Sequence, residues 1–250
     1  MTDDLLLTFS SVSAFDPVTN FALRSQENPL RLDQLWAKLV DGRARVVDAP
    51  AWRANGILVL QLLEVSRPAI KPRCVEVLER LLSGDSQKAC AHDTGLSVSM
   101  ITAMAKQGLS EMGVHCVPSR VPLLLAVLVS SARHQRAFPS ARIIQVCRDG
   151  VTHCIVSVPP PTLLFENVLP EAERAVAALL LEGVQYREIA ARRRTSVRTV
   201  ANQVAAVFHR LNLSGRSELL ACAARSLSSP LSPQPRASGG NQGCPVSQSM

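Results

Sequence analysis

Two stretches of the chain, residues 70–114 and 169–213, align without a gap when the second is shifted back by 99 residues. Only 7 of the 45 aligned positions are identical, but the matches fall at a turn glycine, at a cap serine and along apolar positions. Gly84, for example, corresponds to Gly183. Self-similarity at a fixed spacing is typical of repeated structural units. The alignment therefore predicts an internal duplication in which both stretches adopt one helical fold.

A segment with the pattern of a β-hairpin precedes each stretch. Residues 44–65 hold two aliphatic runs around a Pro, Asn and Gly cluster, and residues 141–158 repeat the pattern with Asp149 and Gly150 at the turn. A short helix that ends at Gly42 is expected before the first hairpin. Its apolar face is formed by Leu32, Leu35, Trp36 and Leu39. We expect a mainly α fold with two β-hairpins, arranged as duplicated units of a hairpin followed by helices.

This organisation divides the chain into four parts. They are an irregular N-terminal segment 1–30, a first unit 31–133, a second unit 134–226, and a Ser, Pro and Gly-rich tail 227–250 that we expect to be disordered. No run approaches the roughly 18 apolar residues of a membrane span. The acidic first residues are unlike a signal peptide. Seven scattered cysteines without a CxxC motif indicate reduced, buried thiols, so we expect a cytoplasmic protein.

Positive charge concentrates in the C-terminal half of the chain. The net charge is +7, and residues 167–225 carry 9 Lys or Arg against 5 Asp or Glu, a net +4. Residues 1–66 carry 6 against 8, a net −2. A basic domain of this kind favours a polyanionic partner, in the first place double-stranded DNA.

The second stretch has the pattern of three helices that end in a long amphipathic one. Pro170 begins the first helix and Gly183 ends it, and residues 185–193 predict a short second helix. Ser196 can cap the third helix. The expected buried stripe of that helix is Val197, Val200, Val204, Val207, Phe208 and Leu211. A short helix, a tight turn and a long amphipathic helix form a helix-turn-helix.

The opposite face of the third helix carries side chains that can recognise nucleic acid. Arginine pairs with guanine, and Asn or Gln with adenine, on base edges in the major groove. The predicted base contacts are Arg198, Thr199, Asn202 and Gln203. The predicted phosphate contacts are Arg187, Arg192, Arg193, Ser196 and Arg210.

These residues resemble the LuxR/GerE-type helix-turn-helix. The matched positions are Leu169, Glu173, Gly183, Arg187-Glu188-Ile189-Ala190, Ser196, Thr199-Val200, Arg210-Leu211 and Arg216-Ser217-Glu218-Leu219. The resemblance covers about 55 residues and implies a four-helix DNA-binding domain of a transcriptional regulator, with Gln203 replacing the usual His. It also implies a fourth helix from about Ser214 that could join two chains into a homodimer. Arg194 departs from the pattern, which has Gly in this turn.

The first stretch resembles the same family less closely. Gly84, Ser97 and Ile101 fit, and the apolar stripe of the third helix persists as Val98, Ile101, Ala105, Leu109 and Met112. Its outward face holds Ser99, Ala103, Lys106, Met100, Met104, Gln107 and Glu111, so the arginine and asparagine are gone. We expect a degenerate copy that keeps the fold, does not read bases, and packs Met100 and Met104 against the other half or a partner.

Other classes of protein are also compatible with parts of the sequence. The arginines could merely be solvated on a small helical bundle, and both copies could bind a protein instead of DNA. The Cys and His residues at 90, 92, 115, 116, 153 and 154 lack the paired spacing of a zinc site. No glycine-rich phosphate loop or paired carboxylates indicate an enzyme. We expect no catalysis, cofactor, metal or small-molecule ligand.

Overall fold

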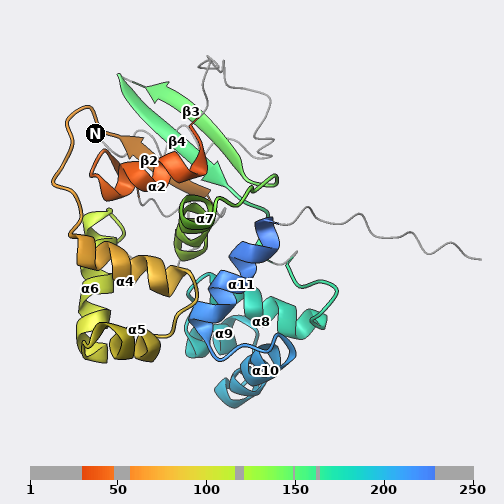
Figure 1. Cartoon of the computed structure of the whole chain (residues 1–250). Coiled ribbons are helices and arrows are strands. Elements are labelled where there is room, and N and C mark those ends of the chain that lie inside the picture. Colours follow the sequence, from red (N-terminus) through yellow and green to blue (C-terminus); the bar gives the residue numbers. More distant parts are fainter. Residues whose placement is uncertain (1–29, 48–56, 116–120, 149, 162–163, 229–250) are drawn as a thin grey trace, which may run out of the picture.

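The computed structural model describes residues 30–47, 57–115, 121–148, 150–161 and 164–228. The protein is mainly helical, with a four-stranded antiparallel sheet at one end and two groups of three helices at the other (Figure 1). In chain order the elements are α2 (Leu32–Val40), β1 (Ala44–Val47), β2 (Ile57–Leu62), α4 (Pro72–Leu82), α5 (Gln87–Thr94), α6 (Val98–Glu111), α7 (Val121–His134), β3 (Arg142–Arg148), β4 (Val151–Ser157), α8 (Glu171–Leu181), α9 (Tyr186–Arg192), α10 (Val197–Arg210) and α11 (Arg216–Ser228).

Both predicted hairpins are confirmed, and they share one sheet. Strand β1 pairs with β2 and β3 with β4, while β2 pairs with β4 with Leu60 opposite Cys154. The strand order is therefore β1-β2-β4-β3, antiparallel throughout. The turn predicted between β1 and β2 lies outside the described residues. Because β2 pairs with β4, both halves of the chain contribute two strands to one sheet.

One face of the sheet is buried beneath helices α2 and α7. Successive side chains of a strand point to opposite faces, so alternate residues line this side. The buried residues are Val46, Leu58, Leu60, Cys154 and Val156. The predicted helix before the first hairpin is confirmed as α2, with its four apolar residues buried and Gly42 in the left-handed conformation beyond its end. The buried face of the sheet and the helices thus share one hydrophobic core.

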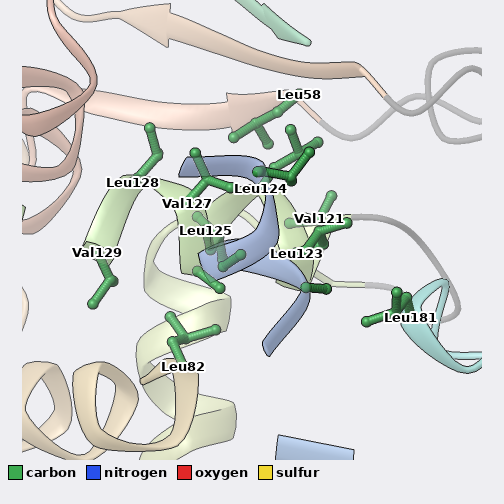
Figure 2. Packing of buried hydrophobic residues seen from close by; sticks show 14 of the residues in the cluster. Leu58, Leu82, Val121, Leu123, Leu124, Leu125, Val127, Leu128, Val129 and Leu181 are labelled. Carbon is green, nitrogen blue, oxygen red and sulfur yellow. The ribbon is translucent and has the colours of Figure 1, made fainter. Parts of the chain in front are cut away.

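Helix α7 is the centre of the protein. It packs against α2, α4, α11 and strand β2, and Figure 2 shows its leucines and valines directed towards Leu58 on the sheet side and towards Leu82 on the α4 side. Every residue from Leu123 to Ser131 is buried. A helix that is apolar on all sides has no amphipathic stripe, so helical periodicity does not predict it. Its apolar run, residues 121–129, was the available signal of a buried element.

The two groups of three helices have matching geometry. Helices α4 and α8, and likewise α6 and α10, begin and end 99 residues apart. The left-handed positions also match, with Gly84 and Gly183, Gly95 and Arg194, and Gly113 and Asn212 forming three pairs at this spacing. The buried residues between the three helices also correspond. In the first group they are Val77, Cys90, Ala91 and Ile101. The residues 99 positions later, which are buried too, are Val176, Ile189, Ala190 and Val200.

Helix α11, the fourth helix predicted from about Ser214, extends further than the predicted domain boundary at residue 226. Helix α11 extends through Ser228, and Leu227 within it is buried. The predicted tail 227–250 therefore begins two residues too early, and residues 229–250 lie outside the described part, as does the predicted N-terminal segment up to residue 29. Among the described residues, no helix is long and apolar enough to cross a membrane.

Candidate nucleic-acid interface

Helix α10 is fixed by a capped N-terminus and a buried apolar stripe. The Thr199 amide donates to the Ser196 hydroxyl at 3.0 Å, so the predicted N-cap is confirmed. The buried residues of the helix are Val200, Val204 and Val207. The predicted stripe is wrong at its start, because Val197 is 45% exposed. The first turn of α10 therefore projects beyond the helices that support the rest.

The face opposite the buried valines is exposed and polar. Arg198, Thr199 and Asn202 all lie on the surface, where they were predicted to lie. The Thr199 hydroxyl is 2.9 Å from the Ser196 hydroxyl, so these two side chains form a small polar cluster at the helix start. At the far end of the same face, His209 is exposed.

Gln203 does not share this exposure. Its side chain is half-buried, and its Oε1 is buried without a hydrogen-bond partner among the described residues. At 100° per residue, Gln203 lies beside the valine stripe rather than opposite it. The predicted outward position of Gln203 is therefore wrong for this oxygen. An unpaired buried amide oxygen costs about 1–3 kcal/mol, so a donor that reached it would be favourable.

The arginines before and at the start of α10 differ in their exposure and in their ion pairs. Arg187 and Arg194 are exposed and form no ion pair within the described part of the chain, and the same holds for Arg198. Arg192 pairs with Glu188 one helical turn earlier. Arg193 is half-buried, and its Nε is buried without a partner among the described residues. The positive end of the helix dipole adds to the charge of these side chains.

Arg210 is not brought together with the other predicted phosphate contacts. It lies at the last residue of α10, about 20 Å from Ser196 at 1.5 Å per residue. Its Nε is 3.0 Å from an oxygen of Glu173, whose side chain is 13% exposed. This ion pair ties α10 to α8, so Arg210, unlike Arg187, Arg194 and Arg198, has a carboxylate partner.

The turn before α10 has the conformation that favours glycine, although an arginine occupies the position. Arg194 has φ of 52°, a left-handed value that favours glycine, and its counterpart Gly95 has φ of 67°. The Thr195 amide donates to the Ala190 carbonyl at 2.9 Å, as the corresponding Leu96 amide does to Ala91 at 3.1 Å. Both turns thus close in the same way, and Arg194 adopts the strained conformation.

The corresponding face of α6 carries little charge. Met100 is 47% exposed and Lys106 is exposed, while the Gln107 amide donates to Glu111 at 2.8 Å. Met104, predicted on the open face, is half-buried and packs against the core of the first group. Val98, predicted in the buried stripe, is 41% exposed. The surface of α6 is therefore near-neutral where that of α10 is basic.

The cysteine and histidine residues that the structure describes do not assemble into a site. Cys90 is fully buried, whereas the neighbouring His92 points into solvent. Burial raises the pKa of Cys154 to about 11, which disfavours the thiolate. Cys147 is exposed, so the prediction that the thiols are buried is only partly correct. Within the described residues no group of three Cys, His, Asp or Glu could hold a metal ion.

A small cavity lies where α8 meets α7 and α11. Its volume is about 220 Å³, and its apolar lining includes Pro122, Leu180, Leu181 and Leu220. Arg216 reaches its edge, and a guanidinium nitrogen donates to the Val184 carbonyl at 2.7 Å. Burial lowers the pKa of Arg216. This arginine holds the start of α11 on the turn after α8, a role that sequence analysis did not assign.

Comparison of the chain with models of protein families, with curated proteins and with solved structures finds no match.

Proposed function

We propose that the chain is a DNA-binding transcriptional regulator whose second group of helices reads the major groove. The observation that carries the proposal is the exposed face of α10, where Arg198, Thr199 and Asn202 lie on the surface and Arg198, like Arg187 and Arg194 before the helix, forms no ion pair within the described residues. Such a helix, held on two shorter ones and basic at its N-terminus, fits the groove and the flanking phosphates. The resemblance to LuxR/GerE-type proteins supports the same function.

In this proposal the side chains of α10 divide into two roles. Arg198, Thr199 and Asn202 contact base edges, with Gln203 contributing through whatever part of its amide the DNA reaches. Arg187 and Arg193 contact phosphates, together with the backbone amides that Ser196 leaves free at the helix start. Arg192 and Arg210 would first have to leave, or share, their carboxylate partners.

The proposal extends to the origin and location of the protein. The matching bounds and turns of α4–α6 and α8–α10 support an internal duplication, in which the first copy has lost base recognition. A regulator of this type works in the cytoplasm, on the bacterial nucleoid.

Selection of bound fragments from sheared genomic DNA tests the proposal. We expect a sequence motif that persists when the salt concentration rises, because contacts to bases are less sensitive to salt than contacts to phosphates. Binding without a motif, and its loss at moderate salt, would show that the arginines supply only charge.

Two substitutions test the division of roles. Arg198→Ala should weaken binding to the selected motif by about 1–3 kcal/mol and relax its specificity, whereas Arg187→Ala should weaken binding to all sequences alike and flatten the salt dependence. The matched controls in the first group are Ser99→Ala and Lys88→Ala, which should change neither property. Equal effects of Arg198→Ala on every sequence would contradict the assignment.

A protein-binding function is the second candidate for the first group. The observation that favours it is the exposed pair Val98 and Met100 at the start of α6, where the second group has Val197 and Thr199 at the surface. Met100→Glu should abolish such an interaction without changing the binding of DNA. Unchanged folding, oligomeric state and binding in a Met100→Glu, Met104→Lys variant would exclude any role for this face.

A further inference from the structure

The face of α11 that could join two chains is already buried inside one chain. Helix α11 packs against α7, and also contacts α4 and α8 (Figure 1). Its buried residues are Leu219, Ala221, Ala223, Ala224 and Leu227, each at most 3% exposed. The approach is close, since a Cβ added to Gly84 would lie 2.9 Å from that of Ala221. The apolar side of this helix therefore has no free area for a second copy.

Helix α7, which covers α11, occupies the corresponding place after the first group of helices. Helix α7 follows α6, the third helix of the first group, just as α11 follows α10 in the second group. The two helices that follow the two third helices thus pack on each other. In a homodimer formed through this helix, the corresponding helices of two identical subunits would contact each other.

We infer that the first group of helices, with α7, takes the place of a partner subunit, so that one chain binds one non-repeated DNA site. This inference rests on the proposed function of α10. Helix-turn-helix dimers bind two half-sites because symmetry presents two identical recognition helices. Here the second recognition helix is α6, whose face is near-neutral, so only α10 supplies base contacts.

Covalent linkage favours this arrangement over a homodimer. A surface in the same chain is present at a high effective concentration, which a second chain at cellular concentrations does not match. A homodimer through α11 would also have to expose the α7 residues that α11 covers. Apart from Leu220, which is partly buried against the core, the remaining surface of α11 is polar or small and includes the exposed Arg225, so it offers no continuous apolar stripe for self-association.

The test is the mass of the full chain, alone and on DNA. Sedimentation from micromolar to near-millimolar protein should give the mass of one chain, and the DNA selected from genomic fragments should contain a single motif copy bound by one chain. Ala224→Arg, which places a charge in the α7–α11 contact, should destabilise folding without changing the mass. The matched control is Arg225→Ala on the exposed side, which should change neither.

Two results would overturn this inference, and a third would overturn only the proposed function of α10. A stable dimer that Ala224→Arg converts into folded monomers would overturn the inference, because α11 would then join two chains. An inverted-repeat motif bound by two chains would overturn it as well. A monomer that selects no DNA would overturn the proposed function of α10 while supporting the in-chain packing of α7 and α11.

Discussion

The two groups of three helices share the spacing of their helices and turns but have different surfaces. Helices α6 and α10 have equal lengths, serine caps at the same position and left-handed turns at the same spacing. Yet the outward position that holds Arg198 in α10 holds Ser99 in α6, and that of Asn202 holds Ala103. The packing of a group of helices depends on its buried and turn positions, so the exposed positions can change without changing it. The difference between the groups is therefore one of chemistry on a shared scaffold.

The groups also differ inside, at the contact between their first and third helices. In the first group Gly108 faces Leu78, and a Cβ at Gly108 would lie 2.5 Å from the Leu78 Cδ1. The corresponding positions of the second group hold Val207 and Ala177, both buried. The large residue has thus moved from one helix to the other, which keeps the total volume similar.

The largest predicted effect tests this exchange of volume. Gly108→Val should lower the free energy of unfolding by about 3 kcal/mol, because its Cβ would already lie 2.5 Å from Cδ1 of the buried Leu78 and its methyl groups would crowd the contact further. Leu78→Ala alone should cost about 2–5 kcal/mol through the cavity that it leaves. The measurement is urea unfolding of the single and double variants.

The double variant, Gly108→Val with Leu78→Ala, recreates the pair of the second group. It should be more stable than the sum of the two single effects predicts, with a coupling of about 1–3 kcal/mol. Additive effects would mean that the two groups pack differently despite their matching helices.

A smaller effect is expected from the turn before the third helix. Arg194→Gly should stabilise the protein by about 1 kcal/mol, because glycine adopts the left-handed conformation without strain. The reverse change in the first group, Gly95→Ala, should cost about 1 kcal/mol from the backbone alone, since no atom lies within 4 Å of the added Cβ. Thermal unfolding of both variants measures these differences.

The same variants bear on the interface with DNA. If Arg194 contacts a phosphate, Arg194→Gly should flatten the salt dependence of binding while it raises stability, and Gly95→Ala should leave binding unchanged. If neither Arg194→Gly nor Gly95→Ala changed the free energy of unfolding, the positive φ of Arg194 would carry no energetic cost.

The smallest effect concerns ion pairs that only the first group has. Arg80 bridges Asp85 and Asp93, where the second group has Leu179, Val184 and Arg192. Hydrogen bonds from Arg80 first, and from His92 second, lower the pKa of Asp93. The stabilisation is therefore present above the unfolded pKa of about 3.9 and is lost as the pH falls through the lower folded value.

Asp93→Asn should accordingly lower stability slightly near neutral pH and leave it equal to that of the natural protein in strong acid. Urea midpoints measured between neutral and acid pH, with the exposed Glu76→Gln as the control, test this. A constant difference at all pH values would show that the carboxylate charge is not responsible.

Much of the candidate site could be predicted from the sequence because its signals are local. The cap at Ser196, the end of α8 before Gly183 and the exposed positions of Arg198 and Asn202 follow from helical periodicity and turn chemistry within one helix-turn-helix. The same rules gave α2 and both hairpins. They failed at Val197, because a helical wheel shows the direction of a side chain but not how far the neighbouring helices extend. At Gln203 the prediction itself was wrong, because 100° per residue places this side chain beside the valine stripe.

The sequence by itself therefore determined most of the local elements, α7 excepted, and the common spacing of the two groups of helices. Only the tertiary structure decided that the hairpins join through β2 and β4, that α7 lies at the centre, and that α11 is covered by its own chain. These contacts link residues far apart in the sequence. Their pairing depends on how complete apolar surfaces fit together, and no local period records that fit.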